Sequence, residues 1–309
     1  MRSRSRRGGL AITGAVLALL PLVLPNAFWY DIATRAAINA VVVIGLNLLI
    51  GYAGQISLGH AGFIGIGAYA SAVLPSRLGW PPIAAVAAGA GAAALLALLV
   101  ARPIMRLRGH SLAMATLGLG IILSMIFTNE ARWTGGPDGI VVLPFSLLGL
   151  EVAGERQWYW VSAALLLVTL WAAGNLVDSP FGRAMRALRT AEPAARAVGV
   201  DPAGIKATIF VLSAAGASLM GSVTAHYLGF VTPQVASFLT SVELLTMVVV
   251  GGMASLGGSV VGAAVLTVLP QLLSRFEGAE TAVFGLVLAV TMIAMPRGLV
   301  PTLRERLGW

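Results

Sequence analysis

Long apolar runs constrain this sequence more than any other feature. Runs of roughly 15 to 22 residues with few charges follow one another along almost the whole chain, separated by short stretches rich in Arg, Pro or Gly. An α-helix needs about 20 apolar residues to cross the hydrocarbon core of a bilayer. With 58% hydrophobic and 10% charged residues among 309, the chain has too little polar surface for a soluble globule. We therefore expect an all-α polytopic membrane protein.

The apolar runs predict about ten transmembrane helices within one transmembrane domain that covers residues 1–309. The basic start and the run that follows it are also compatible with a cleaved signal peptide, but a charge-anchored first helix is the better interpretation. The expected spans are 10–27, 36–50, 58–74, 83–100, 111–127, 158–176, 207–225, 242–254, 260–273 and 283–295.

The distribution of positive charge orients these spans. If the N-terminus is cytoplasmic, fifteen of the twenty Lys and Arg residues fall in cytoplasmic segments. This bias predicts that the N-terminus, the C-terminus and the loop 178–206 lie in the cytoplasm. The net charge of +8 then reflects topology, and we expect no nucleic-acid partner.

Residues 178–206 form a polar stretch between two spans and contain four arginines and the only lysine of the chain. Pro180 predicts the start of a short helix, and Glu192 followed by Pro193 predicts a second, which Gly199 ends. Asp201 and Pro202 then begin a third helix that continues into the membrane. Short amphipathic helices held in water suit docking into another protein, whereas a solvated loop that only fixes orientation is the alternative.

Two glycine-rich stretches, 51–70 and 251–264, interrupt the apolar runs. Close helix packing and broken helices that line a substrate path both explain such stretches. The pattern Gly-x-x-Ser-Leu-Gly occurs in both, at 54–59 and 252–257, and matched segments in two halves of a chain point to a transport pathway, although so short a match also arises by chance. The glycines expected at packing contacts or helix breaks are Gly51, Gly54, Gly59, Gly65, Gly252, Gly257, Gly258 and Gly262.

Polar side chains within the spans each need a partner in lipid. Hydrogen bonding between helices and contact with a substrate both remain open for them. Glu243 has a further interpretation, since Thr240-x-x-Glu243 matches a capping box at a helix start. The candidates along a substrate pathway are Asn39, Asn47, Gln55, Ser57, His60 and Glu243.

The sequence argues against a metal, cofactor or catalytic site in this chain. It has no cysteine, and its three histidines are far apart, so we expect neither a metal site nor a cofactor. No G-x-x-x-x-G-K-[ST] pattern is present, so we do not expect the chain to hydrolyse ATP alone. Ser57 with His60 lacks an orienting third group, which argues against an intramembrane protease.

Five motifs, taken together, resemble the permease subunits of branched-chain amino acid ABC importers. They are GYAGQISLGHAGF at 51–63, TGGPDG at 134–139, GRAMRALR at 182–189 with EPAARAVG at 192–199, HYLGFVTP at 226–233, and residues 243–257. The resemblance extends from about residue 39 to residue 295. It implies an inner-membrane subunit that works with ATPase subunits, a second permease subunit and a periplasmic solute-binding protein. Its small-molecule substrate would be a branched-chain amino acid, urea, an amide or a related solute.

The same resemblance implies a coupling segment that contacts the ATPase. The Glu-x-Ala-Ala-x-x-x-Gly run at 192–199 is similar to that segment, although Pro193 departs from the pattern and leaves its contacts open. A self-sufficient channel or secondary carrier for a small polar solute is the alternative function, and a scaffold without a solute path is a third. The expected coupling residues are Arg183, Arg186, Arg189, Glu192, Ala194, Ala195, Arg196 and Gly199.

Overall fold

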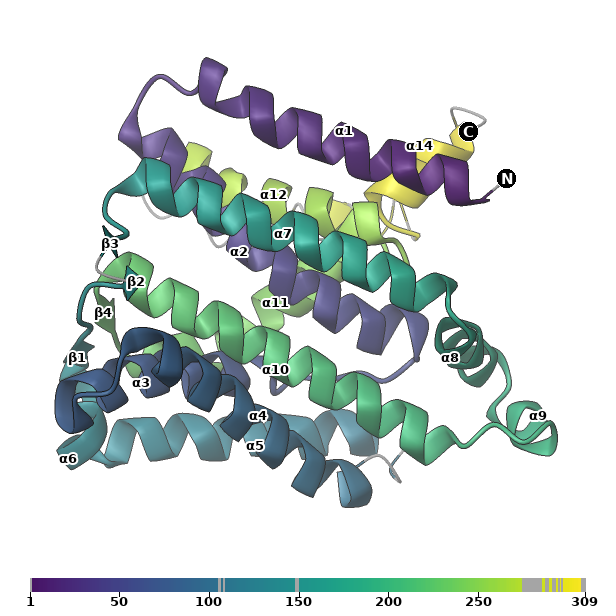
Figure 1. The fold of residues 1–309 in the computed structure, drawn as a ribbon. Coiled ribbons are helices and arrows are strands. Elements are labelled where there is room, and N and C mark those ends of the chain that lie inside the picture. The colour runs from purple at the N-terminus through teal and green to yellow at the C-terminus, as the bar shows by residue number, and fades with distance from the viewer. Residues whose placement is uncertain are drawn as a thin grey trace. The chain divides into compact units, whose positions relative to one another are not determined.

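The structure is a computed structural model, and its described residues are almost entirely helical (Figure 1). They are 2–104, 107, 109–147, 150–273, 285–286, 289–290, 293, 295 and 297–306. Within them, five helices are long and apolar enough to cross a membrane, and the chain is an all-α membrane protein. These five are Ala27–Tyr52, Pro82–Ile104, His110–Asn129, Glu155–Asp178 and Pro202–Leu228.

The chain divides into two compact units. The first comprises 1–47, 154–179 and 244–309, and the second comprises 48–153 and 180–243. The first unit contains α1 (Arg2–Val23), α2 (Ala27–Asn47), α7 (Glu155–Asp178), most of α11 (Phe238–Gly251), α12 (Leu256–Leu273) and α14 (Leu299–Arg306). The second contains η1 (Leu48–Tyr52), α3 (His60–Leu78), α4 (Pro82–Ile104), α5 (His110–Asn129), α6 (Ala131–Thr134), η2 (Gly136–Asp138), α8 (Pro180–Thr190), α9 (Glu192–Ala197), α10 (Pro202–Leu228) and η3 (Pro233–Ala236).

Four short strands complete the second unit. β1 (Ile140–Val141) pairs antiparallel with β4 (Phe230–Val231), with Ile140 opposite Val231. β2 (Ser146–Leu147) pairs antiparallel with β3 (Leu150–Glu151). Each strand has two residues, so they close loops between helices and do not form a sheet core.

In the first unit, α2 packs against α7 and α12, and α1 lies beside α7 (Figure 1). A proline in α1 explains how α1 is held. Pro21 has no N–H to donate to the carbonyl of Leu17 one turn earlier, and the hydroxyl of the buried Tyr159 donates to that carbonyl instead, at 2.6 Å. Tyr30 donates in the same way to the carbonyl of Pro21, at 3.3 Å, and its ring makes an edge contact with Tyr159.

In the second unit, α3, α4 and α10 pack side by side (Figure 1). Small residues let α3 and α10 touch through their backbones. A Cβ added to Gly67 would lie 1.8 Å from the carbonyl oxygen of Ser218, and one added to Gly221 would lie 2.0 Å from that of Ile64. Ser222 also donates to the carbonyl of Gly67 at 2.9 Å, which links the two helices across the contact.

Helices lie over the expected spans from the first to the ninth, while most of the tenth, 283–295, lies outside the described residues. The capping box expected at Thr240 and Glu243 is wrong. α11 begins earlier, at Phe238, and the hydroxyl of Ser237 accepts the backbone N–H of Thr240 at 3.2 Å. Glu243 therefore lies in the second turn of the helix, where it is exposed.

Candidate functional site

The polar segment 178–206 folds into the helices that its sequence predicts. α8 starts at Pro180, α9 starts at Glu192, and Gly199 follows α9 with a φ of 83°. Asp201 caps α10 because its carboxylate accepts the backbone N–H groups of Ala203 and Gly204, at 3.0 and 3.1 Å. α8 and α9 lie at the end of α10 where Pro202 begins it (Figure 1).

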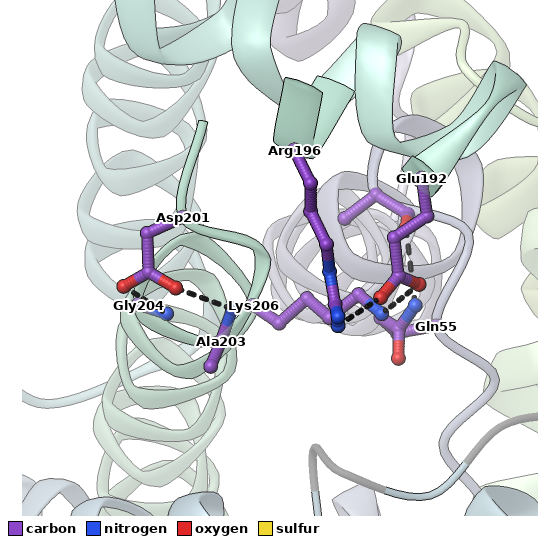
Figure 2. A network of polar contacts seen from close by, with 8 residues as sticks. Gln55, Glu192, Arg196, Asp201, Ala203, Gly204 and Lys206 are labelled. Carbon is purple, nitrogen blue, oxygen red and sulfur yellow. Dashed lines mark hydrogen bonds and ion pairs between the residues drawn. The ribbon is translucent and has the colours of Figure 1, made fainter. Parts of the chain in front are cut away.

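One carboxylate links α9 to α10. Glu192 accepts from Lys206 of α10 at 2.9 Å and from Arg196 of its own helix at 2.8 Å (Figure 2). The two pairs differ in burial, since the Lys206 side chain is 4% exposed and that of Arg196 is 57% exposed. Removal of either partner of a buried ion pair leaves a charge without compensation, whereas an exposed pair contributes little. The Glu192–Lys206 pair is therefore a contact that links α9 to α10.

A second contact links α8 to the first glycine-rich stretch. The guanidinium of Arg189 donates to the carbonyl of Gly51, which is buried in the π-helical turn η1. The stem of Arg189 lies against Gly54, where an added Cβ would be 3.4 Å from Arg189 Cγ. Gly54 has a φ of 70°, a conformation that favours glycine, so the chain turns sharply at this contact.

The other side of α9 is exposed. Pro193, Ala194 and Arg196 are exposed, and Val198 just beyond the helix is 79% exposed, whereas Ala195 is buried. On α8, Arg183 and Arg189 are exposed, Arg186 is half-buried, and the helix buries Gly182, Met185 and Leu188. The segment thus exposes Ala194, Val198 and two arginines, Arg183 and Arg196, whereas Arg189 is engaged with Gly51.

The break after η1 is held by a buried polar network. Ser57 Oγ lies 3.0 Å from Nδ1 of His60, and Nε2 of the same ring lies 2.6 Å from Ser213 Oγ on α10. The backbone N–H of Leu58 donates to Thr116 of α5 at 3.1 Å, and a Cβ on Gly59 would lie 2.2 Å from the Thr116 carbonyl oxygen. His60 is fully buried and joins the break to α10, while Leu58 and Gly59 join it to α5.

Two of the predicted pathway residues hold the first unit together. The amide of Asn47 accepts from the backbone N–H of Ala254 at 2.9 Å. Its two N–H groups face three oxygens, the carbonyls of Gly252 and Ser255 and the hydroxyl of Ser259, at 3.3, 3.0 and 2.7 Å. Asn39, two turns earlier on α2, donates to Thr267 at 3.1 Å.

The second glycine-rich stretch contains the turn that Asn47 holds. Gly252 has a φ of 120° and Ala254 a φ of 60°, so α11 ends there sharply before α12 begins. A Cβ on Gly258 would lie 2.5 Å from the carbonyl oxygen of Gly251, and one on Gly262 would lie 2.1 Å from that of Met247. A Cβ on Gly257 would meet nothing within 4 Å.

Three further predicted residues differ in their surroundings. Gln55 is buried, and its Nε2 donates to the carbonyl of Ala53 at 3.3 Å, while its Oε1 has no hydrogen-bond partner in the described part of the chain. Figure 2 shows its side chain beside the Glu192–Lys206 pair. Gly65 packs closely, since a Cβ there would lie 2.5 Å from the ring of Phe127. Glu243, as described above, is exposed on α11.

The first unit also contains an apolar pocket of about 430 Å³. α1, α2, α7 and α12 line it, and none of the described residues that line it is charged. The hydroxyls of two lining residues, Thr13 and Tyr159, donate to backbone carbonyls of α1. These features suit an apolar group and do not suit a charged solute.

Sequence reasoning overlooked several of these contacts. The bias of positive charge placed the loop 178–206 in the cytoplasm and gave Lys206 no partner, whereas the side chain is buried against Glu192. Sequence reasoning also passed over Ser213 and Thr116, which bind the first break, because single hydroxyl residues in an apolar run carry no distinctive pattern. Gly67 and Gly221 had a usable signal, since Gly67-x-x-x-Ser71 and Ala217-x-x-x-Gly221 both have the small-residue spacing of close helix pairs.

Comparisons with known proteins identify the family. A family model described as the branched-chain amino acid transport system / permease component matches residues 29–296. The high-affinity branched-chain amino acid transport system permease protein LivM of Escherichia coli K12 is 36% identical over 306 residues, which cover 90% of this chain and 71% of LivM. The corresponding permease protein LivH of the same strain is 25% identical over 287 residues, 86% of this chain and 92% of LivH.

A more distant relative belongs to another transport system. The autoinducer 2 import system permease protein LsrC of Photorhabdus laumondii is 32% identical over 154 residues, 48% of this chain and 43% of LsrC. No solved structure matches the chain. The family match contains both glycine-rich stretches and the helices α8 and α9. The chain therefore belongs to the permease components of the branched-chain amino acid transport family, and it is a membrane transport subunit and not an enzyme.

Proposed function

We propose that this chain is the permease subunit of an ATP-driven importer for branched-chain amino acids or related small solutes. It lies in the cytoplasmic membrane, and residues 1–309 act as one permease domain with about ten transmembrane helices. Both termini and the segment 178–206 face the cytoplasm, in line with the bias of positive charge. The cargo follows the names of LivM and LivH, to which the chain is similar over most of its length.

The arrangement of α8 and α9 is the observation that carries this proposal. A permease without a nucleotide-binding motif of its own needs a surface through which a separate ATPase moves it. α9 has an exposed face that contains Ala194, Arg196 and Val198. Its opposite face is fixed to α10 through Glu192 and Lys206. A partner that moves α9 would thereby move a helix long enough to cross the membrane.

The remaining partners are proposed from the family. LivM and LivH are two permease proteins named for the same kind of transport system, which supports a second, different permease as the partner of this chain. A periplasmic solute-binding protein would meet the outer loops, where Gly135, Gly136 and Gly139 all have positive φ and shape a tight turn. Membrane lipid covers the exposed apolar helix faces.

The solute path is proposed to involve fewer residues than the sequence indicated. Four of the candidates form hydrogen bonds between helices or with loops. They are Asn39, Asn47, Ser57 and His60. Gln55, whose Oε1 has no partner in the described residues, and Glu243, which is exposed on an apolar helix, are the two remaining candidates for solute contact.

Transport by purified protein tests the proposal. The chain would be reconstituted into liposomes with its partner permease, its ATPase and its binding protein. Uptake of leucine, urea and a short amide would then be measured with ATP inside the liposomes, with ATP outside them, and without ATP. We expect uptake of a branched-chain amino acid only when ATP is on the ATPase side. Solute flux through the chain without ATPase would instead support a channel or secondary carrier, and no flux under any condition would support a scaffold.

A further inference from the structure

Two contacts attach α8 and α9, which together form the coupling segment, to the rest of the second unit. The two contacts lie at different places. Arg189, in the last turn of α8, binds the carbonyl of Gly51 and packs against Gly54. Lys206, in the second turn of α10, binds Glu192 of α9. Helix α8 is thus attached to residues 51–59, called the glycine break below, and α9 is attached to the transmembrane helix α10.

The two ties converge on the same break. At its start, Arg189 holds Gly51 and Gly54. At its end, Ser213 of α10 lies 2.6 Å from His60, whose ring also binds Ser57. A displacement of α9 that is passed to α10 by Lys206 therefore reaches residues 57–60, and a displacement of α8 reaches residues 51–54. The break is held at both of its ends by elements that are attached to the coupling segment.

The direction of Glu192 is the unexpected part of this arrangement. The family resemblance places this carboxylate in the segment that contacts the ATPase, but here it is turned toward Lys206 and is only 16% exposed. Figure 2 shows the ends of the Arg196 and Lys206 side chains both directed at the carboxylate, with Gln55 beside it. With Lys206 4% exposed, removal of Glu192 would leave a buried charge without its partner, so this ion pair links the two helices.

We propose that Lys206 and Arg189 are positioning residues, which transmit movement of α8 and α9 to the glycine break 51–59. Glu192 binds Lys206 and so connects α9 to α10. The ATPase docks on the exposed side of α9. This proposal rests on the proposed function above, since it says how an attached ATPase acts on the path. Neither residue contacts the solute.

The test measures how much solute is transported for each ATP hydrolysed by the complete reconstituted complex. We expect Lys206→Met and Arg189→Met to lower this ratio about 2- to 30-fold, the range found for residues that couple distant sites. The amount of ATPase that co-purifies with the permease should stay at the wild-type level. Lys206→Arg keeps a cation beside Glu192, so it should restore most of the wild-type ratio of transported solute to hydrolysed ATP. Thr208→Met, which introduces the same side chain at an exposed position on α10, is the matched control.

A double variant separates the link from simple stability. Glu192→Gln with Lys206→Met leaves no buried charge without a partner, so a purely structural role predicts recovery of the ratio. Our proposal predicts that the double variant assembles normally and stays uncoupled. A wild-type ratio in Lys206→Met overturns the proposal, and so does a Glu192→Gln variant that alone loses the ATPase. If the wild-type complex shows no ATP-dependent uptake, the proposed function fails instead.

Discussion

Asn47 shows how one polar side chain in an apolar helix is satisfied. Its amide meets four backbone or side-chain groups around the turn between α11 and α12, where Ala254 adopts a positive φ. A non-glycine residue in that conformation is held by its surroundings, because the conformation is unfavourable on its own. The hydrogen bonds of Asn47 supply that constraint, which gives the side chain a structural role at this turn.

Substitution of Asn47 tests this role. Asn47→Leu leaves the buried carbonyl of Gly252 and the part-buried N–H of Ala254 without their bonds to the amide, and we expect about 1–3 kcal/mol of lost unfolding free energy for each group. Thermal unfolding of the purified protein in detergent measures the loss. Asn39→Leu, on the same helix but with a single bond to Thr267, should cost clearly less. Equal losses in the two variants would contradict the assignment.

Tyr159 and Pro21 provide a second test at a single hydrogen bond. Tyr159→Phe removes the donor to the Leu17 carbonyl and should cost about 1 kcal/mol of stability. Pro21→Ala restores a backbone N–H that donates to the same carbonyl. The Tyr159→Phe penalty should therefore be smaller when Pro21 is replaced by Ala, as measured by unfolding of the four proteins in a double-mutant cycle. Fully additive effects would show that the tyrosine does not compensate for the proline.

Pairs of helices in this protein approach through glycine. α11 and α12 touch where Gly262 faces the Met247 carbonyl and Gly258 faces the Gly251 carbonyl. In lipid, helices gain no hydrophobic driving force against each other, so close packing and hydrogen bonds hold them together. The length of each helix follows from its apolar run, but its neighbours are chosen by such contacts.

A pair of alanine substitutions tests this contact. Gly262→Ala would place a Cβ 2.1 Å from the Met247 carbonyl oxygen, so the helices must separate and we expect a loss of about 1–3 kcal/mol. Gly257→Ala, five residues earlier on α12, meets nothing within 4 Å and should change stability by less than about 0.5 kcal/mol. Unfolding in detergent and the yield of membrane-inserted protein check both. Equal tolerance of the two changes would refute close packing at Gly262.

Local signals in the sequence predicted the helices well. Apolar runs placed the membrane segments, and the starts of α8 and α10 followed from Pro180, Asp201 and Pro202. The start of α11 was missed because Ser237 and Thr240 are both good caps, and the chain uses Ser237. The tie between Glu192 and Lys206 was not predictable either, since it depends on how α9 folds back on α10 and not on the spacing of the two residues in the sequence.

The same distinction holds for the candidate site. The motif at 192–199 correctly pointed to a short helix with an exposed surface. It did not show that Glu192 faces inward, or that Arg189 reaches Gly51. Pairwise contacts between segments far apart in the sequence are set by tertiary packing, so a single sequence identifies the parts of the coupling segment but not their roles.

The proposed function makes the protein as a whole a membrane permease that an ATPase moves from the cytoplasmic side. This account requires α9 to lie in the cytoplasm and to be covered when the ATPase binds. Val198 reports on both requirements, because its side chain is 79% exposed at the end of α9. The chain has no cysteine, so a single Val198→Cys variant can be labelled selectively without further changes.

Labelling of Val198→Cys by a membrane-impermeant maleimide is therefore the most direct measurement. We predict no labelling in intact cells, rapid labelling in inside-out vesicles stripped of the ATPase, and protection once the ATPase subunits are added back. Labelling of intact cells, or the same labelling rate in vesicles with and without the ATPase, would contradict the account.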